Sequence, residues 1–284
     1  MVDAEYYAKV EKKINDTVDS WRNDDNRYQT IDLRLQRPST FMKDAEMLLA
    51  RGKYSFKWRD IPMMKDCKEM MIYQSMLNDI RPRTIIETGT YLGASALWFA
   101  DLAKGLDLDC HVYTVEKFET LVRPSVRTHP GVTCIFGDAN NIREVMPADM
   151  LNGLPHPWLV VEDCHVNVMG LMEHFGTHMV SGDYFAIEDT NHMAPFWDAL
   201  HNSADGGGSG DSKEETMKVF RPPPKGSEGA EVSLEEAPSK SCRKHDTVVE
   251  FLQKYKTEFM VDSFYTDLFG FNGTCTWDGY IRKM

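Results

Sequence analysis

Near-continuous apolar runs alternate with amphipathic stretches between residues 84 and 201. The apolar runs predict strands at 84–88, 111–116, 132–136, 158–162 and 184–188. The stretches between and after them predict helices at 93–104, 141–151, 165–180 and 193–201. Strands that are apolar on both faces are typical of a parallel sheet covered by helices on both sides. With right-handed crossovers, this order predicts an α/β fold with a doubly wound, Rossmann-like sheet.

The pattern before residue 83 is helical instead. Apolar residues at steps of three and four over 3–22 predict an amphipathic helix that packs on the main domain or on another subunit. Further helices are expected near 40–51 and 65–80, and 24–38 reads as irregular. We therefore expect an N-terminal helical extension over 1–82 and one α/β domain over 83–284.

Residues 203–244 interrupt the domain. This stretch is rich in glycine, proline, serine and charged residues, and it cannot build a core. It is interpreted as a flexible insertion, because a helix at 247–255 and strand patterns at 258–264 and 275–282 follow it. The two late strands predict an antiparallel hairpin at the edge of the sheet.

Composition narrows the classes of partner. The 284 residues carry a net charge of −12, which disfavours nucleic acid, because binding phosphates requires a basic surface. No apolar run approaches the roughly 20 residues of a membrane span. The N-terminus lacks the apolar core of a signal peptide, and the six cysteines form no CxxC pair. We expect a cytoplasmic protein that does not bind a membrane.

A glycine turn follows the first of these strands, in the segment Glu87-Thr-Gly-Thr-Tyr-Leu-Gly93. Gly89 suits a tight turn that leaves room for a ligand, and Gly93 lets the next helix approach the strand. The motif is not the GxGxxG of dinucleotide-binding proteins. It starts with an acid, Glu87, which suits the cationic S-adenosylmethionine better than a pyrophosphate.

The next two strands also end in acids. Glu116 is placed to accept the ribose hydroxyls of a nucleoside, and Asp138 to meet the adenine amino group. The alternative interpretation for each acid alone is a solvated carboxylate at a strand end. Three acids after three successive strands favour the cofactor interpretation.

The fourth and fifth strands end in adjacent carboxylates, Glu162-Asp163 and Glu188-Asp189. Neighbouring parallel strands end on the same edge, so these acids should converge. Clustered carboxylates favour a hard cation such as Mg²⁺. The alternative is that Glu188 and Asp189 cap the following helix. Zinc is disfavoured, because no thiolate or imidazole pair has suitable spacing.

In these segments the chain resembles the cephalosporin hydroxylase/rhamnosyl O-methyltransferase family of class I S-adenosylmethionine-dependent methyltransferases. The resemblance covers roughly 56–200 and 245–284. It is carried by 58–65 (WRDIPMMK), 86–90 (IETGT) with 95–100 (SALWFA), 182–189 (GDYFAIED) and 277–282 (WDGYIR).

The resemblance implies a seven-stranded methyltransferase sheet whose last hairpin is antiparallel. It implies S-adenosylmethionine at the glycine turn, with contacts that we assign to Glu87, Thr88, Gly89, Tyr91, Gly93 and Ser95. It also implies a metal held by Asp163, Glu188 and Asp189. This chain departs from the family pattern before His165, so either Glu162 or Asp163 is the ligand, and we prefer Asp163.

The expected activity is methyl transfer to a hydroxyl oxygen of a small molecule, assisted by Mg²⁺ or another divalent cation. His165 is the first candidate for the general base and His192 the second. The alternative is a non-catalytic, cofactor-binding partner of another enzyme such as a hydroxylase. A homo-oligomer is expected from the resemblance and the extra helices.

Overall fold

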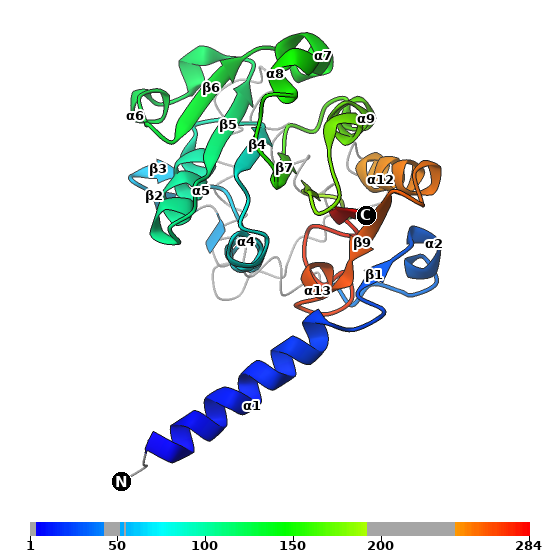
Figure 1. Cartoon of the computed structure of the whole chain (residues 1–284). Coiled ribbons are helices and arrows are strands. Elements are labelled where there is room, and N and C mark those ends of the chain that lie inside the picture. The colour runs from blue at the N-terminus through cyan, green and yellow to red at the C-terminus, as the bar shows by residue number, and fades with distance from the viewer. Residues whose placement is uncertain (1–3, 43–51, 54, 192–241) are drawn as a thin grey trace, which may run out of the picture.

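The computed structural model describes residues 4–42, 52–53, 55–191 and 242–284. Its main element is one eight-stranded sheet (Figure 1). In spatial order its strands are β1 (Tyr28–Gln29), β9 (Phe259–Asp262), β10 (Tyr280–Lys283), β8 (Tyr184–Ile187), β7 (Trp158–Glu162), β4 (Thr84–Thr88), β5 (His111–Glu116) and β6 (Val132–Phe136). A separate two-stranded ribbon pairs β2 (Lys57–Trp58) with β3 (Ile61–Pro62).

Five neighbouring strands are parallel, as predicted, from β6 at one edge through β5, β4 and β7 to β8. β10 runs antiparallel to both β8 and β9, which confirms the antiparallel hairpin. The last strand starts at Tyr280, five residues later than the predicted 275–282. The doubly wound α/β prediction is confirmed, and the described sheet has one strand more than the seven expected.

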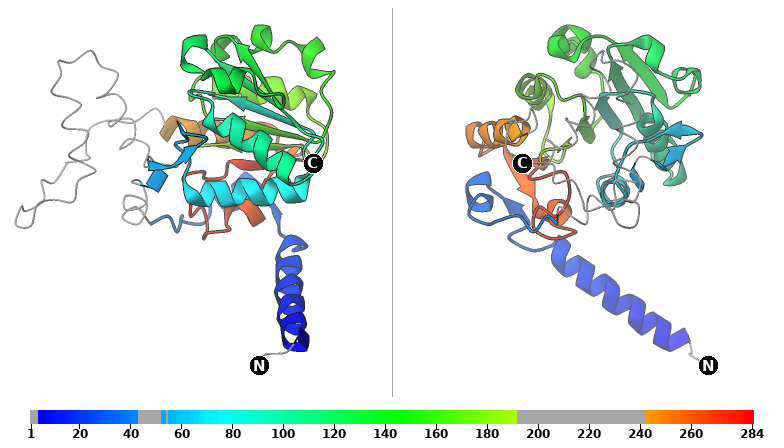
Figure 2. Two further views of the ribbon diagram at one scale, coloured as in Figure 1. Left: turned by 90° about the vertical axis from the view of Figure 1, so that its left-hand side faces the viewer. Right: turned by 180° about the vertical axis from the view of Figure 1, so that it is seen from behind.

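Helices cover both faces of this sheet (Figures 1 and 2). The described helices are α1 (Ala4–Arg22), α2 (Ile31–Arg34), α4 (Cys67–Ile80), α5 (Ala94–Gly105), η1 (Glu119–Leu121), α6 (Pro124–Arg127), η2 (Ala139–Asn141), α7 (Ile142–Val145), α8 (Ala148–Leu151), α9 (Val168–His178), α12 (Cys242–Lys254) and α13 (Ser263–Thr266). Successive strand residues point to opposite faces. Ile85 packs with residues of α4 and α5 in one cluster, and Ile86 with residues of α9 and α12 in the other.

Three helix predictions either need correction or fall on residues that the structure does not describe. The single helix expected at 141–151 is two short helices, because Pro147 cannot donate a hydrogen bond to the preceding turn and serves as the N-cap of α8. The predicted helix at 193–201 lies outside the described residues, as do most of 40–51 and residues 203–241 of the predicted insertion. The last residues of that insertion, from Cys242, belong to α12.

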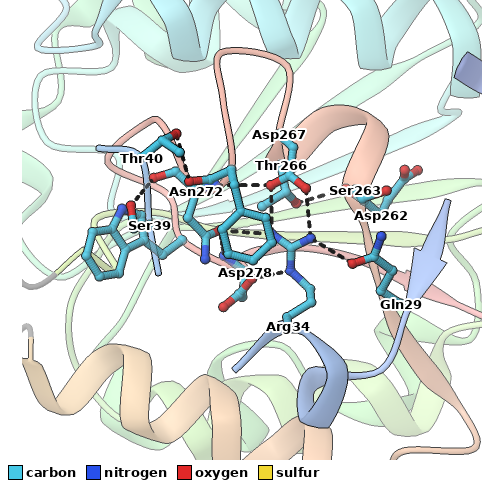
Figure 3. Close-up of polar contacts among 12 residues, drawn as sticks. Gln29, Arg34, Ser39, Thr40, Asp262, Ser263, Thr266, Asp267, Asn272 and Asp278 are labelled. Carbon is cyan, nitrogen blue, oxygen red and sulfur yellow. Dashed lines mark hydrogen bonds and ion pairs between the residues drawn. The ribbon is translucent and has the colours of Figure 1, made fainter. Parts of the chain in front are cut away.

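The segment expected to be irregular, 24–38, instead contains β1 and α2. β1 pairs with β9 through Tyr28 and Asp262. Ile31 of α2 joins the hydrophobic core, and the Arg34 side chain is fully buried against the C-terminal segment, where it contacts Asp267 and Asp278 (Figure 3). This part of the N-terminal extension is therefore integrated into the sheet. The domain division at 82/83 stays a prediction.

The predicted N-terminal helix forms as α1. It leaves the body at its C-terminal end and points away from it (Figures 1 and 2). No residue of α1 is buried in the described structure, so the helix does not pack on the main domain. Within the part of the chain that the structure describes, no helix is both long and apolar enough to cross a lipid bilayer.

Candidate cofactor and metal site

The turn after β4 requires glycine at its first position. Gly89 has φ +104°, and a Cβ atom there would lie 2.6 Å from the carbonyl oxygen of Asp163. The amide of Asp163 in turn donates to the carbonyl of Thr88, at 2.9 Å. The glycine turn and the first acid after β7 are therefore in direct contact.

The second glycine of the turn has a different neighbour from the one expected. Gly93 has φ +91° and is the N-cap of α5, but a Cβ there would meet Val126 of α6 at 2.6 Å rather than the strand. Thr88 and Ser95 are buried on either side of the turn, whereas the Tyr91 side chain is 48% exposed. The predicted cofactor residues thus form one continuous turn with a single exposed aromatic side chain.

Glu87 is fully buried beneath this turn. Its Oε2 atom accepts a hydrogen bond from the Thr114 hydroxyl at 2.6 Å. Its Oε1 atom is buried and has no hydrogen-bond partner of normal geometry among the described residues. Burial raises the pKa of Glu87, and the nearby Lys65 ammonium offsets this only in part.

The acids after β5 and β6 have local structural contacts. Glu116 accepts hydrogen bonds from the amides of Tyr91 (2.8 Å) and Phe118 (3.1 Å). Asp138 caps η2 and lies 2.8 Å from the Lys117 ammonium, whose hydrogen bond lowers the pKa of Asp138 to about 2. A carboxylate oxygen can accept more than one hydrogen bond, so neither set of contacts prevents ligand binding.

The carboxylates after β7 and β8 converge, as predicted. The amide of Glu188 donates to the carbonyl of Glu162 at 3.0 Å, which aligns the two strand ends. Glu162 and Glu188 are buried, and Asp163 and Asp189 are partly exposed. The first acid of each pair thus lies inside the sheet, and the second lies at its edge.

A buried lysine, Lys65, lies among these acids, whereas the sequence alone favoured a solvated side chain at this position over one that closes on the cofactor. The Nζ atom of Lys65 is 2.7 Å from Asp163 Oδ2 and 2.6 and 2.5 Å from the two oxygens of Glu188. The Tyr73 hydroxyl also donates to Glu188, at 2.5 Å. Burial lowers the pKa of Lys65, but Asp163 and Glu188 raise it above its usual value, so the lysine stays charged.

Two further lysines reach the cluster from other segments. Lys244 of α12 forms an ion pair with Glu162 at 2.6 Å, and Lys53 lies 3.8 Å from Asp189. The capping box of Asp66 and Glu69 starts α4 at a fixed point, and this fixes the position of the adjacent Lys65. The only sequence signal for Lys65 was its place in the segment 58–65. For Lys244 there was no local signal.

His165 lies at the open side of the cluster. Its Nε2 atom is 3.5 Å from Asp163 Oδ1 and 3.7 Å from Asp189 Oδ2. Its Nδ1 atom is 3.2 Å from the Lys244 ammonium. Ligand atoms of Asp163, His165 and Asp189 all lie within 4.8 Å of one another. His192, the other predicted base, lies outside the described residues.

Two of the three predicted metal ligands therefore converge, and the third does not. Asp163 and Asp189 present oxygens to a common point, whereas the oxygens of Glu188 are directed to Lys65 and Tyr73. Glu162, the alternative to Asp163, faces Lys244 and accepts the amide of His165 at 2.9 Å. The geometry therefore favours Asp163 over Glu162 as a donor.

Comparison with known proteins identifies relatives of one kind. The family model described as rhamnosyl O-methyltransferase/CmcI matches residues 51–210, more than half of the chain. Rhamnosyl O-methyltransferases of Mycobacterium tuberculosis (strain ATCC 25618 / H37Rv) and Mycobacterium leprae (strain TN) are each 26% identical, over 134 and 143 residues. These matches cover 45% and 47% of this chain, and 54% and 60% of the relatives. The chain thus spans little more than half the length of the curated relatives it matches.

Solved structures of CmcI share the fold. The Mg-SAM form of CmcI has a TM-score of 0.54 at 22% identity and covers 87% of each chain. The apo form has a TM-score of 0.56 at 22% identity, over 87% of this chain and 86% of that one. At this identity the likeness shows the fold.

Proposed function

The chain belongs to the rhamnosyl O-methyltransferase/CmcI family, and from that premise we propose that it is an S-adenosylmethionine-dependent methyltransferase assisted by a divalent cation. The favoured acceptor is a hydroxyl oxygen of a small molecule. One observation carries the proposal: the glycine turn after β4 touches the acid cluster after β7, through Gly89 and Asp163. A methyl donor at the turn and a cation at the cluster would lie side by side.

The donor set suits a divalent cation. Asp163 and Asp189 offer hard oxygens to the cation, and the imidazole of His165 lies within the same 4.8 Å group. Glu188, the third ligand that the resemblance implies, is held by Lys65 in this arrangement. It would join the set only if Lys65 moved away from it.

The turn also suits S-adenosylmethionine. Among the described residues, one buried oxygen of Glu87 has no hydrogen-bond partner of normal geometry, which fits a ligand with a positive charge or an amino group. Glu116 lies against Tyr91 at the adjacent strand end, and Asp138 follows at the next one. These contacts support the predicted cofactor residues Glu87, Thr88, Gly89, Tyr91, Gly93, Ser95, Glu116 and Asp138.

When bound, the cofactor supplies the methyl group, and the cation lowers the pKa of the acceptor hydroxyl. The chain's own residues hold and orient these groups, which supplies much of the rate. We assign proton removal to His165, because its imidazole lies at the edge of the acid cluster with its side chain 46% exposed. His192 stays a prediction.

The acceptor class follows from the same geometry. A divalent cation that keeps open positions binds two neighbouring oxygens well, so a vicinal diol, a sugar or a catechol-like acceptor is favoured. The alternative function stays a non-catalytic helper of another enzyme such as a hydroxylase. That role predicts cofactor binding without turnover. The homo-oligomer and the cytoplasmic location stay predictions.

The test combines binding and turnover. We expect calorimetry to detect S-adenosylmethionine and Mg²⁺ in either order of addition, and methylation of at least one diol or glycoside in an acceptor screen. Asp189→Asn should weaken Mg²⁺ binding at least tenfold, whereas the matched control Asp109→Asn, at a 92% exposed side chain, should not. Binding of neither ligand would reject the proposal. Binding of both without any turnover would favour the helper role.

A further inference from the structure

The five apolar side chains of one α1 stripe are arranged symmetrically about Ile14. Val10 and Val18 lie four residues from it, and Tyr7 and Trp21 lie seven residues from it. At about 100° per residue, all four project within about 40° of Ile14 on the helix surface. Tyr7, Ile14 and Trp21 are 63%, 57% and 59% exposed.

A helix of this kind needs a partner. Most helical stability in proteins comes from packing an apolar face, and no residue of α1 is buried in the described structure. α1 is joined to the body at its C-terminal end, where Arg22 pairs with Asp79 at 2.9 Å, and from there the helix points away from the body (Figure 1). The stripe therefore has the composition of the core of a protein interface, but it lies exposed on the helix surface.

We propose that α1 pairs antiparallel with α1 of a second copy of this chain, across a two-fold axis at Ile14. In that arrangement Ile14 meets Ile14, each Val10 meets the Val18 of the other copy, and each Tyr7 meets a Trp21. The contact is isologous, so the same five side chains serve both copies. It does not depend on methyl transfer.

Charge and geometry select the antiparallel direction. The half of α1 before Ile14 carries three lysines against two glutamates, and the half after it carries two aspartates against one arginine. Antiparallel pairing sets the net basic half beside the net acidic half and opposes the helix dipoles. It also sends the two bodies to opposite ends of a helix about 28 Å long, whereas parallel pairing would crowd them at one end.

The oligomeric state tests this contact directly. One helix per chain makes a small interface, so we expect association in the micromolar range. Light scattering on the full chain between about 1 and 100 µM should show twice the 32.6 kDa of one chain, or a multiple of that mass. Ile14→Asp, which places two like charges on the axis, should halve the mass. Ala8→Asp, about 120° around the helix, should leave it unchanged.

A cross-linking experiment tests the direction. Mixed under mild oxidation, Tyr7→Cys and Trp21→Cys should form a disulfide between unlike chains, whereas parallel pairing would give Tyr7→Cys linked to itself. The unmodified chain in the same oxidant is the control for the native cysteines. A monomer at every concentration, or an oligomer whose mass Ile14→Asp leaves unchanged, would overturn the proposal.

Discussion

At the scale of single residues, Lys65 decides how four carboxylates can share one edge of a sheet. Buried acids without a partner would take up protons instead of staying charged. Lys65 compensates Asp163 and Glu188 directly, and Lys244 compensates Glu162. The cluster is therefore preformed, with Asp163 and Asp189 still presenting oxygens toward His165.

Replacing Lys65 with methionine should destabilise the protein by about 3–5 kcal/mol, because it leaves the buried Glu188 and the partly exposed Asp163 without the ammonium. A divalent cation should restore part of this loss by taking the place of the ammonium. We expect Mg²⁺ to raise the melting temperature of Lys65→Met more than that of the parent. Lys9→Met, at an exposed pair with Glu5, is the control and should change stability little. Equal responses of Lys65→Met and parent to Mg²⁺ would contradict a cation site here.

His165→Gln separates two roles of the imidazole. As a general base, His165 should contribute roughly 10²–10⁴-fold to kcat, with the metal dissociation constant changed less than threefold. We expect this result, measured by steady-state kinetics and by Mn²⁺ titration. His178→Gln, at a partly exposed histidine bonded to Asn152, should leave both quantities unchanged. A large loss of metal affinity would assign His165 to the ligand set instead.

At the scale of elements, the turn after β4 requires glycine at position 89 for two separate reasons. Gly89 combines a left-handed backbone with the close approach of β7, whereas Gly182 has a similar φ of +99° and nothing within 4 Å of an added Cβ. The two positions together separate the backbone cost of alanine from the steric cost.

Gly182→Ala should cost about 1–2 kcal/mol in unfolding free energy, from the left-handed backbone alone. Gly89→Ala should cost at least about 2 kcal/mol more, because its Cβ would meet the Asp163 carbonyl at 2.6 Å and force β4 and β7 apart. It should also weaken S-adenosylmethionine binding, whereas Gly182→Ala should not. Urea unfolding and calorimetry provide the two measurements. Equal losses at the two positions would show that β7 does not crowd the turn.

The same elements show what the sequence could predict. β4, β5, β6 and β7 start and end where expected, because buried parallel strands are continuous apolar runs flanked by turn residues. β1 was missed, because two residues that pair with β9 leave no local pattern. The burial of Lys65 and Lys244 among the acids was missed for a related reason. Their burial depends on acids about 100 and 80 residues away, and local periodicity does not report such contacts.

At the scale of the whole molecule, the N-terminal segment is anchored to the C-terminal one through the buried Arg34 (Figure 3) and the partly buried Arg27. Arg34 contacts Asp278 and binds both oxygens of Asp267, at 3.0 and 2.8 Å, and Arg27 binds both oxygens of Asp262, at 2.9 and 2.7 Å. His245 of α12 also reaches Asp278, at 3.1 Å. The contacts of the two arginines join residues more than 200 positions apart, so the first 40 residues stabilise the edge of the sheet as well as carrying α1.

Arg34→Met should therefore act as a global destabilisation rather than a local one. Removing the guanidinium leaves Asp267 and Asp278 uncompensated, and we expect a loss of about 3–5 kcal/mol in a single unfolding transition. Although burial raises the pKa of Asp278, His245 and Arg34 hold it below the usual value, so the stability from this carboxylate is present above about pH 4 and is lost as the pH falls through the lowered pKa. The difference in unfolding free energy between parent and variant should shrink over that pH range.

The control is Arg83→Met, at an exposed pair with Asp109, which should cost less than about 1 kcal/mol at any pH. Two separate unfolding transitions in the parent would show instead that the N-terminal segment folds independently of the sheet.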